Sequence, residues 1–238
     1  MRLYEACFSE TERLLRAYPF RSLETDGAPW PDGGKNQLIF RGDAACELGG
    51  GTLPAVSGMA LTDRADLVPR DEILLCGPNL PELHGDVPYA RLTQIRVREQ
   101  EMGEGSRFYQ TIRKIEYTRY HVSPEGFMMR ISAMSHRESA RVGKLALENG
   151  LDFARVGQSF LRAYHEHPAV EAVKLVFITQ PDFPYDEAAQ VAESGENITK
   201  ALDHLLQKVK MDCNICSLKE VCAEVEALCK TDFPQETV

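Results

Sequence analysis

Short apolar runs separated by turn-forming segments fill residues 36–190, and this spacing restricts the possible folds more than any other feature. Each run has the length of a β-strand, and the intervening segments are rich in glycine, proline, asparagine and aspartate, which favour turns. We expect five strands here: QLIF (37–40), VSGMALT (56–62), EILLCG (72–77), ARLTQIRVR (90–98) and GFMMRISAM (126–134). We expect turns or loops between them: GDAACELGGG (42–51), GPNLPELHGD (77–86) and EMGEGS (101–106).

A helix followed by a further strand is predicted after residue 150. The segment ESARVGKLALENG (138–150) favours a helix or turn closed by Gly150. LDFARVGQSFLRAYHEH (151–167) has apolar residues at helical spacing and ends before Pro168, and AVEAVKLVFIT (169–179) has the composition of a buried strand. Helices combined with several short strands predict an α+β fold, with a mostly antiparallel or mixed sheet and packed helices.

The two ends of the chain differ in character from this central part. Residues 4–18 have helical periodicity, and the Pro- and Gly-rich segment TDGAPWPDGGKN (25–36) follows them. GENITKALDHLLQKVKMD (195–212) predicts a helix capped at Asn197, and the cysteine-rich tail follows it. We therefore expect an N-terminal helix and linker (1–35), an α+β domain (36–190) and a small helical, cysteine-rich tail (191–238).

Charge and hydropathy exclude several classes of partner. The formal net charge is −9, whereas nucleic acids and anionic membranes attract basic surfaces. No apolar run approaches the roughly 20 residues that span a bilayer, and the N-terminal segment is too polar for a signal peptide. The sequence thus predicts a cytoplasmic protein that binds neither nucleic acid nor membrane.

Four of the seven cysteines gather in MDCNICSLKEVCAEVEALC (211–229) with the pattern C-x2-C-x5-C-x6-C. Clustered cysteines in a reducing compartment are more typical of metal ligands than of disulfides. One C-x2-C pair followed by single cysteines favours an iron–sulfur cluster over zinc, whose sites usually use two pairs. The alternatives are a structural zinc site, or a helix that carries cysteine as a small apolar residue. The candidate ligands are Cys213, Cys216, Cys222 and Cys229.

The segment CNICSLKEVC resembles the cluster-binding segment of acetyl-CoA synthase, the β subunit of the carbon monoxide dehydrogenase/acetyl-CoA synthase complex. Further similar segments precede it in the order found in that family's middle domain: CELGGGTLPAVSGMALTD, DEILLCGPNLPEL, RKIEY, MMRISAMSHRESA and GLDFARVGQSFLRAYHEHPAVEAVKLVFITQ. The resemblance covers roughly residues 40–229. It implies a 4Fe–4S cluster, a role in anaerobic carbon monoxide metabolism, and arginine-rich strands that bind coenzyme A.

The chain also departs from the family pattern. The gaps after Cys216 and Cys222 are shorter than the family's, and the chain has no Cys-Gly-Cys tripeptide, which holds nickel in that family. The resemblance implies that Arg113, Arg119 and Arg130 contact coenzyme A, although these segments lack the family's tryptophan.

The functional expectation is therefore a 4Fe–4S protein that serves as an electron-transfer or accessory component of one-carbon metabolism, with a redox or metalloenzyme protein as its partner. The first alternative is an acetyl-CoA synthase component whose nickel site a partner completes, with coenzyme A as a ligand. The second is a zinc-stapled interaction domain. A homo-oligomer is a further state that the sequence leaves open.

Three other features have simpler interpretations. The triple glycine of ELGGGTLP favours a tight turn over a phosphate loop, because the register of known phosphate-binding motifs is absent. Arg96 and Arg98 are expected on a solvated strand face, paired with Glu99, Glu101 and Glu116, and the alternative is an anion site of the coenzyme A kind. His165 and His167 are expected to stabilise the end of a helix, and Cys76 to belong to the core.

Overall fold

A five-stranded mixed sheet forms the centre of the protein in the computed structural model, which describes residues 2–24, 27–131, 137–206, 216 and 218–232. Its order is β1-β4-β8-β5-β3, and two of its neighbouring pairs, β4·β8 and β3·β5, are parallel while the others are antiparallel. The strands are β1 (Arg21–Ser22), β3 (Ala55–Thr62), β4 (Glu72–Cys76), β5 (Tyr89–Val97) and β8 (Val170–Ile178).

A second, smaller sheet is entirely antiparallel and has the order β2-β7-β6. It consists of β2 (Ala44–Leu48), β6 (Phe127–Ile131) and β7 (Glu138–Gly143). Helices and mixed sheets combine in one fold, so the predicted α+β class is confirmed, including a helix in the cysteine-rich tail.

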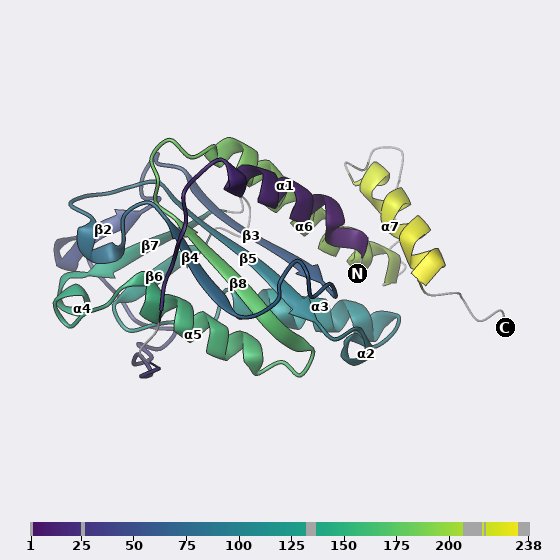
Figure 1. Cartoon of the computed structure of the whole chain (residues 1–238), viewed down its shortest axis with the longest axis horizontal. Coiled ribbons are helices and arrows are strands. Elements are labelled where there is room, and N and C mark those ends of the chain that lie inside the picture. Colours follow the sequence, from purple (N-terminus) through teal and green to yellow (C-terminus); the bar gives the residue numbers. More distant parts are fainter. Residues whose placement is uncertain (1, 25–26, 132–136, 207–215, 217, 233–238) are drawn as a thin grey trace.

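Helices cover both faces of the large sheet (Figure 1). Helices α1 (Glu5–Arg16) and α6 (Tyr185–Leu206) pack on one face, and α3 (Ser106–Thr118) and α5 (Phe153–His165) pack on the other. The tail helix α7 (Lys219–Asp232) packs against α6 and the N-terminal 3-10 helix η1 (Arg2–Tyr4). The remaining helical turns are η2 (Arg41–Asp43), η3 (Leu80–Glu82), α2 (Glu99–Met102) and α4 (Lys144–Glu148).

Strand β5 illustrates how alternation assigns side chains to the two layers. Ala90 and Leu92 belong to the apolar cluster beneath α1 and α6, whereas Arg91 points to the other face and lies over the Phe160 ring of α5. On the first face α6 lies so close to β3 that a Cβ atom added at Gly195 would lie 2.9 Å from the Met59 carbonyl oxygen. Glycine at this position therefore permits the contact between helix and sheet.

Most of the long periodic elements agree with the sequence-based predictions. Strands form within 56–62, 72–77, 90–98, 126–134 and 169–179, and helices form within 4–18 and 151–167. The domain boundaries near 36 and 191 stay predictions, and α6 runs continuously through residue 191.

Five local predictions are wrong. QLIF is not a strand, because side chains occupy its backbone groups: Met128 Sδ accepts from the Ile39 N–H and Arg141 donates to the Ile39 carbonyl. Residues 44–48 form strand β2 rather than a turn, and 138–143 form strand β7 before α4 begins. RKIEY lies in helix α3 rather than a strand. Helix α6 begins at Tyr185, so Asn197 is inside the helix and does not cap it.

A buried ion pair between Arg91 and Glu138 joins the two sheets. Arg91 Nε donates to Glu138 Oε1 at 2.9 Å and Nη2 donates to Oε2 at 2.6 Å, and both side chains are fully buried. Arg91 Nη2 also donates to the Arg119 carbonyl at 3.2 Å, and the guanidinium carbon lies 4.0 Å from the Phe160 ring centroid. Burial lowers the pKa of Arg91, but Glu138 more than offsets this, so its pKa lies above the ordinary value.

We expect Glu138→Gln to lower the free energy of unfolding by about 3–5 kcal/mol, because it leaves the buried Arg91 charge without a counter-ion. Urea unfolding of the two proteins measures this difference. Arg70→Ala is the control, since Arg70 pairs with Glu72 at the surface and its loss should leave the midpoint unchanged. A Glu138→Gln protein as stable as the parent would contradict a structural role for the pair.

Candidate functional site

The described cysteines fall into two groups with different surroundings. Cys7, Cys46 and Cys76 are 4%, 2% and 1% exposed and pack in the core, as predicted for Cys76. Burial raises the pKa of all three thiols to about 11. Burial disfavours the thiolate form that metal ligation and nucleophilic attack need, so the core position of these three cysteines favours a packing role.

Cys216 and Cys222 lie at the N-terminal end of α7, and both are partly exposed. The Lys219 N–H donates to the Cys216 carbonyl at 3.2 Å, and the Cys222 N–H donates to the Leu218 carbonyl at 2.8 Å. These bonds place one cysteine just before the helix and the other in its first turns. Val225, which is 2% exposed, packs in the main core and fixes α7 to the body of the protein.

The other two candidate ligands are less completely defined. Cys213 lies outside the described residues, and Cys229 is described only as a position within α7. The helix is continuous from Lys219 to Asp232, which places Cys229 two turns beyond Cys222, roughly 10 Å along the axis. Two thiolates at that separation reach one small cluster only if the helix opens between them, so ligation by Cys229 stays a prediction.

The chemistry of this segment suits a metal or cluster that prefers thiolates. Cys216 and Cys222 are partly exposed on one end of one helix, where the partial positive charge of the unpaired N–H groups favours anions. Binding of a cluster or of zinc by Cys216 and Cys222 stays a prediction. Within the described residues, which do not include Cys213, no three His, Cys, Asp or Glu side chains are grouped around a common point.

The three arginines predicted to bind coenzyme A do not come together. Arg113 lies on α3 and pairs with Glu116 at 2.6 Å. Arg119 caps the same helix, is 5% exposed, and stacks on the Tyr120 ring at 4.6 Å. Arg130 is exposed on β6. The site residues implied by the resemblance therefore belong to two different regions of the structure, and one of them, Arg119, is buried.

Arg130 instead lines a pocket of about 300 Å³ with two arginines that the sequence analysis did not single out, Arg137 and Arg141. We call it the arginine pocket; its other lining residues are Glu47, Gly49, Gly50, Gly51, Ser139 and Ala140. Three guanidinium groups face one carboxylate here, which makes the pocket cationic in a protein of net charge −9. The sequence contains a signal for this pocket, because Arg137, Ser139 and Arg141 alternate and therefore lie on one face of a strand. In the structure Ser139 is the register partner of Arg130, which brings Arg130 to the same face.

The triple glycine forms one wall of this pocket. Gly49 and Gly51 have φ of +62° and +59°, a left-handed conformation that glycine adopts without strain. Arg137 Nη2 donates to the carbonyls of Gly49 and Gly51 at 2.9 and 2.5 Å and to that of Leu53 at 2.8 Å. The glycine segment is thus a tight turn, as predicted, and Arg137 is the residue that holds it in place.

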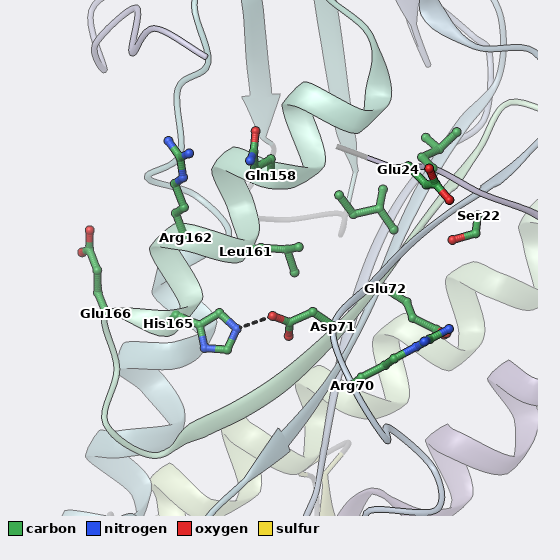
Figure 2. A pocket seen from close by; sticks show the side chains of 12 residues that line it. Ser22, Glu24, Arg70, Asp71, Glu72, Gln158, Leu161, Arg162, His165 and Glu166 are labelled. Carbon is green, nitrogen blue, oxygen red and sulfur yellow. Dashed lines mark hydrogen bonds and ion pairs between the residues drawn. The ribbon is translucent and has the colours of Figure 1, made fainter. Parts of the chain in front are cut away.

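A second surface feature is a polar groove of about 730 Å³ between α5 and the start of β4 (Figure 2). His165 at the end of α5 forms a 2.8 Å hydrogen bond to Asp71 Oδ2, and Asp71 Oδ1 accepts from the Val173 N–H at 2.9 Å. The carboxylate therefore ties α5 to β8, the central strand of the large sheet. A histidine–carboxylate pair needs a nucleophile for hydrolysis, and Figure 2 shows Ser22 on the opposite side of the groove from His165.

The remaining predicted features have structural partners. Arg96 and Arg98 both pair with Glu171 at 3.1 Å rather than with the neighbouring glutamates. His167 forms a 2.5 Å hydrogen bond with Thr118 Oγ1, and burial lowers its pKa. Neither His165 nor His167 acts simply as a helix cap, because each binds a side chain from another segment.

Comparison of the sequence with models of known protein families and with curated proteins gives no match. Within the described residues, no helix is both long enough and apolar enough to cross a bilayer.

We expect an alkylating reagent at pH 8 to modify Cys216 and Cys222 long before the core cysteines of the native, metal-free protein. A thiol with a pKa of about 11 is a thiolate in only about one molecule in a thousand at that pH, and Cys7, Cys46 and Cys76 are also buried. Mass spectrometry of tryptic peptides gives the order of modification. In urea all five should react, and rapid native labelling of Cys76 would contradict the assignment.

Proposed function

We propose that this chain is an iron–sulfur protein whose cysteine-rich tail binds a 4Fe–4S cluster. The observation that supports the proposal best is the division of the cysteines: three are buried in the core, while Cys216 and Cys222 are partly exposed beside a helix N-terminus. A helix N-terminus favours the thiolate form, which is the form that binds a metal. The C-x2-C spacing makes Cys213 the third candidate ligand, although it lies outside the described residues.

The described residues contribute position and electrostatics to this site. The turn from Cys216 to Lys219 and the first turns of α7 hold the two cysteine backbones in a fixed relation, and Val225 anchors the helix to the core. A bound 4Fe–4S cluster with only thiolate ligands supplies one-electron transfer. Cys222 lies partly buried against the main core, which limits the contact of that side with solvent.

We propose further that the protein is related to acetyl-CoA synthase and is an electron-transfer or accessory component of anaerobic carbon monoxide metabolism. The order of the similar segments along residues 40–229 supports this relation. The missing Cys-Gly-Cys supports an accessory role, because nickel in planar coordination needs those thiolates and the amides between them. Such a role requires a redox or metalloenzyme protein as the partner. The alternative is a zinc-stapled interaction domain, and metal analysis of the purified protein distinguishes it from an iron–sulfur protein.

We expect protein isolated without oxygen to contain about four irons and four sulfides per chain, with the broad visible absorption of such clusters. Replacing Cys213 and Cys216 together with serine should abolish the absorption, because the C-x2-C pair is lost. Iron, sulfide and zinc determination on the same samples gives the measurement. Stoichiometric zinc without iron would show that the site is structural.

Two further variants define the ligand set. Cys76→Ala is the matched control, since this thiol is in the core and its loss should leave the iron content unchanged. Cys229→Ala tests the fourth position: loss of iron or a three-iron spectrum would mean that α7 opens to let Cys229 bind. An unchanged spectrum would mean that the continuous helix persists in the loaded protein and that Cys229 is not a ligand.

The arginine pocket favours a second candidate function, which is the binding of coenzyme A. In this function the chain would be an acyl-transfer component that acts with a nickel-bearing partner. Arg130, Arg137 and Arg141 provide planar donors suited to phosphate, and the pocket of about 300 Å³ is large enough for a phosphate group. Arg141 is partly neutralised by its short ion pair with Glu47, and Arg137 is engaged with the glycine turn. Arg130 is the arginine best placed to bind an added anion, since it is exposed and has no ion-pair partner among the described residues.

We expect Arg130→Ala to weaken the binding of coenzyme A about tenfold in calorimetric titration, the cost of one charge-assisted hydrogen bond. Pantetheine, which lacks the phosphates, should not bind, and inorganic phosphate should bind weakly at the same residue. Arg70→Ala, a surface arginine outside the pocket, is the control. Equal binding by both variants would place the ligand elsewhere or remove this candidate function.

A further inference from the structure

An apolar groove of about 720 Å³ lies beside the small sheet, between the segment after Trp30 and helix α4, whose position Figure 1 shows. We call it the apolar groove; its apolar lining comes mainly from Trp30, Leu38, Ile39, Leu145 and Ala146. These residues come from three separate parts of the sequence, so the groove is formed by the tertiary fold. It is separate from the cysteine-rich tail and is not used by the proposed function.

Exposed apolar side chains concentrate at this groove. Among the described residues four large hydrophobic side chains are strongly exposed, and three of them are here: Leu38 at 76% and Leu145 at 69% line it, and Phe40 at 68% follows Ile39. The fourth, Tyr117, lines a different pocket. Contiguous apolar surface of this kind typically marks a binding site on a soluble protein.

The backbone that carries Leu38 and Phe40 is fixed rather than free to fold inward. The Gln37 side-chain amide donates to the carbonyls of Pro124 and Phe127 at 3.0 and 3.2 Å and accepts from the Gly126 N–H at 3.1 Å. Ile39 is held at both its N–H and its carbonyl by Met128 and Arg141. The apolar surface is therefore preorganised, which reduces the entropy lost when a partner binds.

Charge at the groove favours a basic occupant. Asp43 and Glu125 line it, both are exposed, and neither has an ion-pair partner among the described residues. Lys144 also lines it and its Nζ donates to the Gly42 carbonyl at 2.8 Å, so two carboxylates and one ammonium leave the lining with a net charge of −1. A second copy would bring two acidic rims together in chains that each carry −9, so like charges oppose self-association here.

We propose that the apolar groove binds an amphipathic helix of a different protein, with leucine-like side chains seated between Leu38 and Leu145 and with lysine or arginine residues facing Asp43 and Glu125. Helices commonly dock in this way, placing apolar residues at i, i+3, i+4 and i+7 in a hydrophobic groove. Basic flanks supply specificity and faster association, and the apolar contacts supply most of the affinity. This inference does not depend on the iron–sulfur proposal.

The test uses the full-length protein and a fluorescent synthetic helix of leucine and lysine, about 18 residues long so that it can form a stable helix. The comparison peptide has glutamate in place of every lysine. We expect the lysine peptide to bind and the glutamate peptide not to, with an affinity that falls as salt is added. Leu145→Ser should weaken binding about tenfold, whereas Tyr117→Ser, which removes an exposed apolar side chain outside the groove, should not change it.

Other outcomes overturn the proposal. Equal binding of the two peptides would remove the role of Asp43 and Glu125, and equal losses in the Leu145→Ser and Tyr117→Ser proteins would mean that the peptide adheres without a site. Failure of the lysine peptide to bind would remove the helical occupant. Sedimentation that shows a dimer, dissociated by Leu145→Ser, would identify a second copy as the occupant instead.

Discussion

The buried pair Arg91–Glu138 is the contact on which the arrangement of both sheets depends. One partner comes from a central strand of the large sheet and the other from the first residue of β7 in the small sheet, and neither is exposed to solvent. The same guanidinium reaches the end of α3 through the Arg119 carbonyl and α5 through the Phe160 ring. Two charges taken out of water need close mutual pairing, and here two of the three guanidinium nitrogens of Arg91 bond to Glu138, so the position of β7 relative to β5 is narrowly specified.

The surfaces with chemical interest depend on that placement. Strand β7 carries Arg137 just before it and Arg141 within it, and its pairing with β6 brings Arg130 to the same pocket. The opposite end of β7 leads into α4, whose Leu145 forms one wall of the apolar groove. The arginine pocket and the apolar groove thus both lie at a sheet of three short strands, and both would be lost if β7 were displaced.

The cysteine-rich tail belongs to a different part of the molecule. Helix α7 packs on α6 and η1, at the end of the structure where Figure 1 shows the N-terminus, while the small sheet lies at the other end. A cluster in the tail and an anion in the arginine pocket would therefore occupy separate regions. A role in electron transfer for the first does not require ligand binding at the second, which agrees with an accessory protein as well as with part of a larger enzyme.

The sequence by itself determined the elements whose patterns are long and regular. The apolar runs of β5 and β8 and the apolar stripe of α5 are local properties, and each predicted its element without knowledge of the fold. The clustering of cysteines at 213–229 is local too, and the metal site that it indicates stays a prediction. The tertiary structure decided the rest. QLIF has a strand composition but is held by Met128 and Arg141, and the arginine pocket needs β6 and β7 to pair across residues that are distant from the glycine turn. Contacts between distant segments decide these features. A local pattern indicates which side chains share one face of a helix or strand, but not which residues from other segments they contact.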